Sequence, residues 1–256
     1  MIESVTSLSN PLVKESLEAL SEGTLFALEG TRTLRDALDA GVVPVRVFFE
    51  TGGLPRDLSS ALSKAGTELV PCGARVVEKL SDLRSTRGAV ALAAPWSVAP
   101  SELALPADGF AILLDGIQDP ANVGAILRSA EAFGAKAALL TKGCASPFAT
   151  KAFRASAGSV LRVPLATGLA PADAVAWVRS VNARLVGADA HDGSEPPPAA
   201  LERPFVLAVG SEGHGFSQDV RLAVDLAVRV PLEGGVESLN AAVAASVLLF
   251  ALSRHA

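Results

Sequence analysis

Continuous apolar stretches constrain the fold of this chain more than any other feature of its sequence. Residues 110–114 and 205–209 contain no polar side chain, and each is followed by a loop and then by a helical pattern. A strand that is apolar at every position must be buried on both faces, which is typical of a parallel sheet covered by helices. Further elements extend the pattern: strands at 137–140, 161–164, 184–188 and 226–230, and helices at 122–133, 147–157 and 172–182. We therefore expect an α/β fold whose ligands bind beyond the carboxyl ends of the strands.

The first part of the chain is expected to form a smaller unit of its own. Residues 1–95 alternate short helical and strand patterns, which indicates a small α/β domain. Residues 96–108 hold two prolines among small residues and are interpreted as a linker. The parallel sheet is then assigned to residues 109–256.

The stretch 228–252 joins a polar loop to an apolar helix. A short β-branched run ends at a proline, two glycines follow, and the helix from 241 to 252 has Ser246 as its only polar side chain. A helix that is apolar all round is expected to be buried. Ser238 and Asn240 stand where a helix cap would stand, so they either satisfy the first-turn N–H groups or contribute to a site.

Two other loops also place polar residues between an apolar strand and a helix. The loop after 110–114 leads to Asn122 and Arg128, and the loop after 205–209 contains three glycines and Glu212. Each has an ordinary interpretation, with Asn122 as a helix cap and the two charged residues as solvated side chains. Because the carboxyl ends of parallel strands meet at one edge of a sheet, we expect the three loops to converge on a site.

Charge and cysteine content narrow the class of protein. The net charge of −5 argues against a protein that coats nucleic acid by general attraction, yet six basic residues face one acidic residue between 128 and 162. Cys72 and Cys144 lack metal-ligand spacing. There is no secretory pattern and no run of about 20 apolar residues. We expect a cytoplasmic protein with reduced thiols, no metal and no membrane anchor.

The three loops carry ordered motifs. They read Asp119-Pro-x-Asn122-Val-Gly-x-Ile-x-Arg128-Ser-Ala, then Val209-Gly-Ser-Glu212-Gly-x-Gly-Phe, then Val230-Pro-x-x-Gly-x-x-x-Ser238-Leu-Asn240-x-x-x-Ala. These stretches resemble the three motifs of the SpoU (TrmH) family, which are RNA ribose 2′-O-methyltransferases of the SPOUT superfamily. The N-terminal stretch Phe26-Ala-Leu-Glu29-Gly-Thr-Arg32 is similar to that family's substrate-binding domain, which resembles an RNA-binding fold of ribosomal proteins.

The resemblance implies a fold, an activity and a set of site residues. It implies a trefoil-knotted domain at 109–256, an RNA-binding domain at 1–95, a homodimer in which the closing helix takes part, and S-adenosylmethionine as cofactor. The implied catalytic residues are Arg128, Asn122, Glu212, Ser238 and Asn240. The implied cofactor contacts are Gly210, Val230, Leu239, Leu232 and Gly187. RNA contacts are expected at Arg32 and Arg87 by resemblance, and at Lys151 and Arg154 because they are three apart on one predicted helix.

Several alternatives stay open. Ribosomal RNA is preferred over tRNA as substrate because of the additional N-terminal domain. A non-catalytic RNA-binding or antibiotic-resistance protein on the same fold is the main rival, and a nicotinamide enzyme is disfavoured because no strand is followed by GxGxxG. His191, His214 and His255 have no metal spacing and are interpreted as surface residues. The sequence does not identify the target nucleotide, and it leaves open whether Arg128 removes a proton or orients the hydroxyl.

Overall fold

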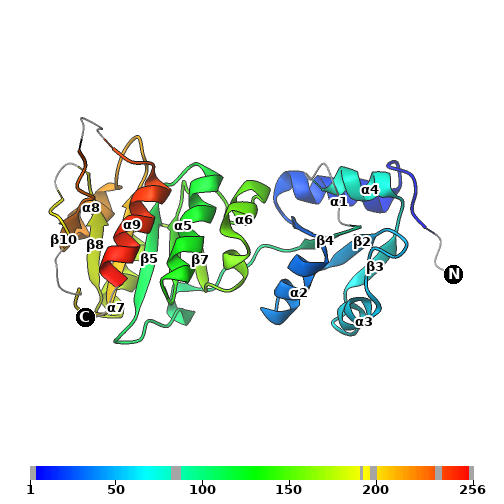
Figure 1. Ribbon diagram of the computed structural model, residues 1–256, viewed down its shortest axis with the longest axis horizontal. Coiled ribbons are helices and arrows are strands. Elements are labelled where there is room, and N and C mark those ends of the chain that lie inside the picture. Colours follow the sequence, from blue (N-terminus) through cyan, green and yellow to red (C-terminus); the bar gives the residue numbers. More distant parts are fainter. Residues whose placement is uncertain (1–3, 82–87, 191–192, 197–200, 234–237, 254–256) are drawn as a thin grey trace. The chain divides into compact units, whose positions relative to one another are not determined.

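The structure divides into two compact units, each with its own sheet and core. It is a computed structural model that describes residues 4–81, 88–190, 193–196, 201–233 and 238–253. The first unit is Met1–Trp96 and the second is Ser97–Ala256 (Figure 1). The three loops singled out in the sequence all belong to the second unit.

The first unit is a four-stranded sheet with helices on both faces. Its strands are β1 (Phe26–Glu29), β2 (Arg46–Phe49), β3 (Glu68–Pro71) and β4 (Ala89–Ala93), and its helices are α1 (Pro11–Glu22), α2 (Thr31–Asp39), α3 (Arg56–Lys64) and α4 (Ala74–Leu80). In the order β1-β4-β2-β3, β4 runs antiparallel to both neighbours and β2 runs parallel to β3. Figure 1 shows α1 and α4 on one face and α2 and α3 on the other. This is a small α/β arrangement.

The second unit contains a six-stranded sheet in which every neighbouring pair is parallel. Its strands are β5 (Phe110–Asp115), β6 (Ala138–Thr141), β7 (Leu165–Leu169), β8 (Arg184–Ala188), β9 (Phe205–Gly210) and β10 (Leu226–Val228), in the order β10-β8-β9-β5-β6-β7. Every residue of β5 and β6 is buried. The prediction of an α/β fold built on a parallel sheet is therefore confirmed.

Helices cover both faces of this sheet. Figure 1 shows α5 (Pro120–Ala132), α6 (Thr150–Ser156) and α9 (Ala241–Ser253) side by side in front of it, and α5 packs against both of the others. On the other face lie α7 (Pro171–Ser180) and α8 (Gln218–Ala223), with Trp177, Val178 and Val220 in the core against the strands. The short turns η1 (Pro100–Glu102) and η2 (Ser159–Leu161) complete the unit. In the part of the chain that the structure describes, no helix combines the length and the apolar character that a membrane crossing requires.

The strand expected at 161–164 is wrong. Its first residue, Leu161, is the last residue of η2, and β7 begins only at Leu165. Val163 N–H donates to Ser159 O within the turn, whereas Pro164 O accepts from Ala138 N–H at the start of the ladder with β6. Proline has no N–H to donate to a neighbouring strand. Pro164 therefore contributes only its carbonyl oxygen, and β7 begins at the next residue. The stretch 160–166 therefore divides into a turn and a strand.

The expectation that the closing helix is buried on all sides is also wrong. Ala245, Leu248, Leu249 and Leu252 of α9 are buried, as expected of a helix that packs on a sheet. On its other face Val243, Val247 and Phe250 keep exposed fractions of 50%, 42% and 47%. Their spacing of four and three residues makes a single apolar stripe along the helix. The sequence of α9 is apolar on all sides, so it could not show that one face of the helix remains exposed.

Candidate active site

The three predicted loops meet beyond the carboxyl ends of β5 and β9. These strands are direct neighbours in the sheet, and their last residues, Asp115 and Gly210, pair with each other. From β5 the chain continues to β6 on one side, whereas β9 lies on the other side, so the strand order reverses at this point. Ligands of open α/β sheets bind at such a reversal, in the crevice between the two outgoing loops.

A hydrogen-bonded network joins one residue from each loop. The Asn122 side-chain amide donates to Glu212 Oε1 over 2.7 Å. The Asn240 amide donates to Asn122 Oδ1 over 3.0 Å and to Glu212 Oε1 over 3.1 Å. Asn122 is buried, with 7% of its surface exposed. The structure thus brings together three of the five residues predicted as catalytic.

The same residues also serve as helix caps. Asn240 Oδ1 accepts from the N–H groups of Ala242 and Val243 in the first turn of α9. Glu212 Oε1 accepts additionally from Ala241 N–H over 3.2 Å. The capping interpretation of Asn240 is therefore correct, and it coexists with the network, because the amide nitrogen reaches the other loops while the oxygen caps. The start of α9 is fixed by residues more than 25 positions away.

The first loop is held in place by Asp119 rather than by Asn122. Asp119 precedes α5, its Oδ1 accepts from Ala121 N–H, and Pro120 occupies the first helical position. Lys151 Nζ on α6 donates to the same oxygen over 2.8 Å. This hydrogen bond from Lys151 lowers the pKa of the Asp119 carboxyl below its usual range. The alternative interpretation of Asn122 as the helix cap is therefore wrong, and its side chain is left for the network.

Three residues that the sequence did not single out connect the bases of these loops through hydrogen bonds. Asp115, 3% exposed, accepts from the Thr141 hydroxyl over 2.8 Å and from Ser217 N–H over 2.7 Å. Thr141 Oγ1 also accepts from Gly116 N–H. One buried carboxylate therefore connects the ends of β5 and β6 with the start of α8, on the far side of the Glu212 loop. Asp115 and Thr141 are the last residues of apolar strands, which is the signal that could have identified them.

Arg128 lies outside this network. It is exposed on α5, and within the described residues its side chain makes no hydrogen bond or ion pair. Six residues after Asn122, it is about 9 Å further along the helix and points roughly 120° away around the axis. Ser238 is exposed as well. The guanidinium is thus available to solvent and to a ligand on a different side of α5 from Asn122.

Three of the residues predicted to contact a cofactor lie in the third loop, of which 234–237 fall outside the described residues. Leu232 is 37% exposed, and Val230 and Leu239 are partly exposed. The N–H groups of these three residues make no hydrogen bond to another described residue. Gly210 and Gly187 are packed by protein instead: a Cβ on Gly210 would lie 2.6 Å from Gly215, and one on Gly187 would lie 2.9 Å from Val224.

The residues predicted to bind RNA are mostly exposed but differ in their partners. Arg32 is exposed at the start of α2. Lys151 and Arg154 are exposed on α6, and Lys151 is paired with Asp119. Arg87 lies outside the described residues. In the same basic segment, Arg162 is paired with Glu131 and lowers the pKa of that carboxyl.

Neither cysteine has the environment of a reactive thiol. Burial raises the pKa of the Cys72 thiol to about 11. Burial likewise raises the pKa of Cys144, whose Sγ lies 3.3 Å from Leu114 O. A nucleophilic thiol needs a lowered pKa, so both groups are protonated near neutral pH. Within the described residues there is no group of three His, Cys, Asp or Glu side chains that could hold a metal ion.

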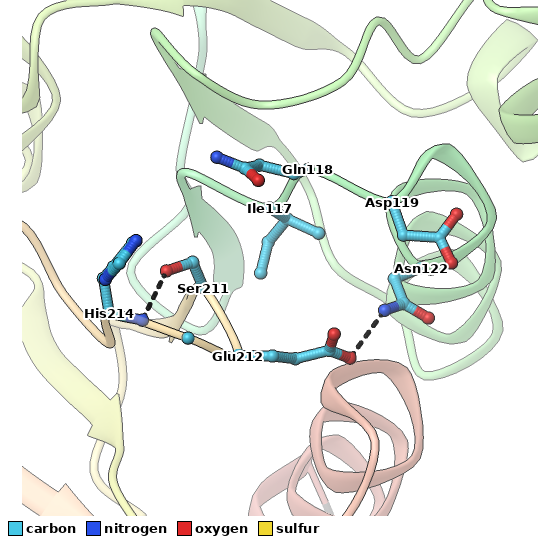
Figure 2. A pocket seen from close by; sticks show the side chains of 8 residues that line it. Ile117, Gln118, Asp119, Asn122, Ser211, Glu212 and His214 are labelled. Atoms are coloured by element: carbon cyan, nitrogen blue, oxygen red, sulfur yellow. Dashed lines mark hydrogen bonds between the residues drawn. The ribbon is translucent and has the colours of Figure 1, made fainter.

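A small pocket of about 120 Å³ opens between the first two loops. Figure 2 shows Asp119 and Asn122 at one end of it, His214 and Ser211 at the other, and the Glu212 side chain reaching across to Asn122. Its lining consists of Ile117, Gln118, Asp119, Asn122, Ser211, Glu212, Gly213 and His214. The network therefore forms one wall of a cavity that is open to a ligand.

Comparison with known proteins identifies relatives of the whole chain. Residues 109–250 match the model of the SpoU rRNA Methylase family. An uncharacterized tRNA/rRNA methyltransferase of Mycobacterium ulcerans is 32% identical over 236 residues, which cover 88% of this chain and 76% of that protein.

Two solved structures share the fold over nearly the full length. An AdoMet-bound rRNA methyltransferase from Sinorhizobium meliloti has a TM-score of 0.89 at 24% identity, covering 98% of this chain and 97% of that one. An RNA 2′-O ribose methyltransferase has a TM-score of 0.78 at 29% identity, covering 98% of both chains. The architecture described above is therefore shared by enzymes that methylate RNA.

Proposed function

Because the chain belongs to the SpoU rRNA methylase family and is an RNA methyltransferase, we propose that it methylates a ribose 2′-hydroxyl, with S-adenosylmethionine as methyl donor. The observation that carries the proposal is the Asn122–Glu212–Asn240 network, which ties the three family motifs into one site. Its 29% identity to an RNA 2′-O ribose methyltransferase over 98% of both chains supports ribose rather than base as the position modified.

The third loop fits a cofactor that is bound largely through backbone groups. The N–H groups of Val230, Leu232 and Leu239 make no hydrogen bond to another described residue. Beside their exposed or partly exposed apolar side chains, they suit an adenine ring and its polar edge. Gly210 and Gly187 contribute backbone at most, since protein atoms occupy the space where their side chains would be. When bound, S-adenosylmethionine supplies an electrophilic methyl group. The trefoil knot around this loop remains part of the proposal.

The chain's own residues must make a ribose hydroxyl nucleophilic. A hydroxyl is a weak nucleophile until its proton is removed or the developing charge is stabilised. A guanidinium group is a hydrogen-bond donor without an acceptor, so the proposed role of Arg128 is to orient the hydroxyl and to stabilise negative charge on its oxygen. Asn122, Asn240 and Ser238 are proposed to shape the site around the reacting atoms. Glu212 positions both asparagines through its shared oxygen.

The substrate and the assembly belong to the proposal as well. We prefer ribosomal RNA over tRNA because the chain carries an additional N-terminal unit, to which Arg32 and Arg87 are assigned as RNA contacts. On α6, Lys151 and Arg154 are assigned to RNA phosphates. We further propose a homodimer that buries the stripe Val243, Val247 and Phe250 of α9, and a cytoplasmic location where its RNA substrates are found.

Methyl transfer from labelled S-adenosylmethionine to purified ribosomal RNA and tRNA tests the function. The native protein and Arg128→Ala are compared, with Arg184→Ala as matched control, because Arg184 is exposed at the amino end of β8, away from the loops. We expect ribose methylation of ribosomal RNA by the native protein and by Arg184→Ala, and a loss of at least 100-fold, or about 2.7 kcal/mol, in Arg128→Ala.

The other results are equally informative. Label in tRNA alone would keep the chemistry and overturn the substrate preference. Methylation of a base would overturn ribose as the target. Cofactor and RNA binding without label in either RNA would favour the non-catalytic rival, and the absence of cofactor binding would refute the proposal as a whole.

A further inference from the structure

The pocket between the first two loops is not accounted for by the residues that are proposed to bind the cofactor or to act on the ribose. None of the residues assigned to the cofactor, which are Gly210, Val230, Leu232, Leu239 and Gly187, lines it. Arg128 does not line it either. Of the residues assigned to catalysis, Asn122 and Glu212 form only one of its walls. No role has been assigned to three other residues of the lining, Ile117, Gln118 and His214.

The size of the pocket selects the kind of group that it can accept. Pockets that enclose a drug-sized ligand have roughly 300–1,000 Å³. The volume of about 120 Å³ is well below this range, so the pocket holds one ring system and leaves the remainder of a larger ligand outside. A nucleobase is such a ring, and the ribose and phosphate attached to it would then lie at the mouth, beside α5.

The lining offers the groups that recognise a base. Ile117 is 1% exposed and contributes an apolar surface, while Gln118 and His214 are exposed. Within the described residues, neither the Gln118 amide nor the His214 ring makes a hydrogen bond. Figure 2 shows the Gln118 side chain extending towards the His214 end of the pocket. An amide presents a donor and an acceptor to the edge of a base, and an imidazole ring offers a face for stacking.

The position of His214 is fixed by the backbone of its loop. Ser211 and Gly215 exchange two backbone hydrogen bonds of 3.0 and 2.9 Å, which close a tight hairpin, and His214 N–H donates to Ser211 Oγ over 3.2 Å. Gly215 adopts φ +65°, a conformation that glycine tolerates at little cost. The opposite wall is fixed by Asn122 and Glu212. The pocket is therefore formed before a ligand arrives, which lowers the entropy cost of binding.

We propose that this pocket receives the nucleobase of the target nucleotide, with the His214 ring stacked on the base and the Gln118 amide hydrogen-bonded to its edge. Gln118 and His214 are thus specificity-determining residues. The inference rests on the proposed function, because it takes the ligand to be the nucleotide whose ribose is methylated. Sequence-specific reading of RNA requires bases that are unstacked and turned outward, so the target lies in a single-stranded region.

A binding experiment tests the pocket without requiring catalysis. The chain has only three histidines, so their ring signals can be resolved by NMR, and the His214 signals are assigned by their loss in His214→Asn. The full chain, saturated with S-adenosylmethionine, is titrated with single-stranded pentaribonucleotides of A, C, G or U. We expect one of the four to shift the His214 ring signals at concentrations roughly tenfold lower than the others, and Gln118→Ala to remove that preference.

Three results of the titration would overturn the inference. The first is binding of the pentamers with no change at His214, and the second is no binding of any pentamer. The third is a shift of the His214 signals on addition of S-adenosylmethionine alone, which would assign the pocket to the cofactor. Gln218→Ala is the matched control, because Gln218 is an exposed glutamine on α8 that does not line the pocket, and its base preference should equal that of the native protein.

Methyl transfer then separates this inference from the proposed function. Once the methylated nucleotide is mapped, RNAs with each base at that position are compared as substrates of the native protein, Gln118→Ala and His214→Asn. A loss of discrimination of about tenfold in both variants supports the inference. Unchanged discrimination overturns it while the function stands. Base-dependent binding at His214 without methylation of any RNA would support the pocket and refute the methyl-transfer function.

Discussion

At the scale of single residues, Glu212 is the centre of the site because one of its oxygens accepts three hydrogen bonds. The donors are the side chains of Asn122 and Asn240 and the N–H of Ala241. A carboxylate oxygen is a stronger hydrogen-bond acceptor than an amide oxygen, so a glutamine at this position should hold the three donors less firmly. Asn122, which is buried, would lose a partner that water cannot easily replace.

We predict that Glu212→Ala lowers the free energy of unfolding by about 1–3 kcal/mol, because the buried Asn122 amide loses its acceptor and the first turn of α9 loses part of its cap. Glu212→Gln, which keeps an oxygen of similar position, should lie between Ala and the native protein. Urea denaturation measures both, with the exposed Glu202→Ala as control. Equal stability of all four proteins would show that the network contributes nothing to folding.

The ion pair of Asp119 and Lys151 gives a pH dependence at the same scale. Because Lys151 lowers the pKa of Asp119 below its ordinary value of 3.8, the pair stabilises the fold above that pH, and its contribution is lost as the pH falls through the lowered pKa. We predict that Lys151→Met returns the pKa of Asp119 towards its ordinary value. Carboxyl ¹³C NMR across an acid titration measures the shift. The same titration of Lys142→Met, at an exposed lysine without this partner, should leave Asp119 unchanged.

At the scale of elements, α5 and α6 approach each other so closely at Gly124 that even a Cβ atom does not fit there. A Cβ at Gly124 would collide with the carbonyl oxygen of Ala152 on α6. The contact is between backbones, so no rotamer change can relieve it. This contact also fixes the helix that carries Asn122 and Arg128.

We predict that Gly124→Ala destabilises the protein by about 1–3 kcal/mol through overpacking and displaces α5 from α6, although alanine ordinarily favours helix. Thermal unfolding measures the change. Gly213→Ala is the control, because a Cβ there meets nothing within 4 Å. A more stable Gly124→Ala protein would mean that the two helices separate without cost.

Particular elements show what the sequence could and could not predict. The parallel sheet and the convergence of Asn122, Glu212 and Asn240 follow from apolar strands and from motif order. The hydrogen bond between Asp115 and Ser217 could not be predicted from the sequence, because it depends on which strand ends become neighbours in the sheet. The boundary of β7 was misplaced because hydrophobicity alone does not register the missing N–H of Pro164.

At the scale of the whole molecule, the stripe on α9 determines the expected assembly. We predict that Val247→Glu converts a homodimer into monomers, because a charge would be buried in an apolar contact. Analytical ultracentrifugation measures the mass of each protein. Leu222→Glu is the matched control, since Leu222 is 79% exposed on α8 and is not part of the stripe. A native protein that sediments as a monomer at micromolar concentration would refute the proposed dimer.

The network also determines when, during synthesis, the protein becomes functional. Asn122 and Glu212 are 90 positions apart, and Asn122 and Asn240 are 118 apart. Contacts between such distant residues form late, because the chain between them must first be ordered. Asn240 follows both of its partners in the chain, so a nascent polypeptide must extend past residue 240 before the site can close. A nascent chain that stops short of residue 240 therefore lacks one of the three residues of the network.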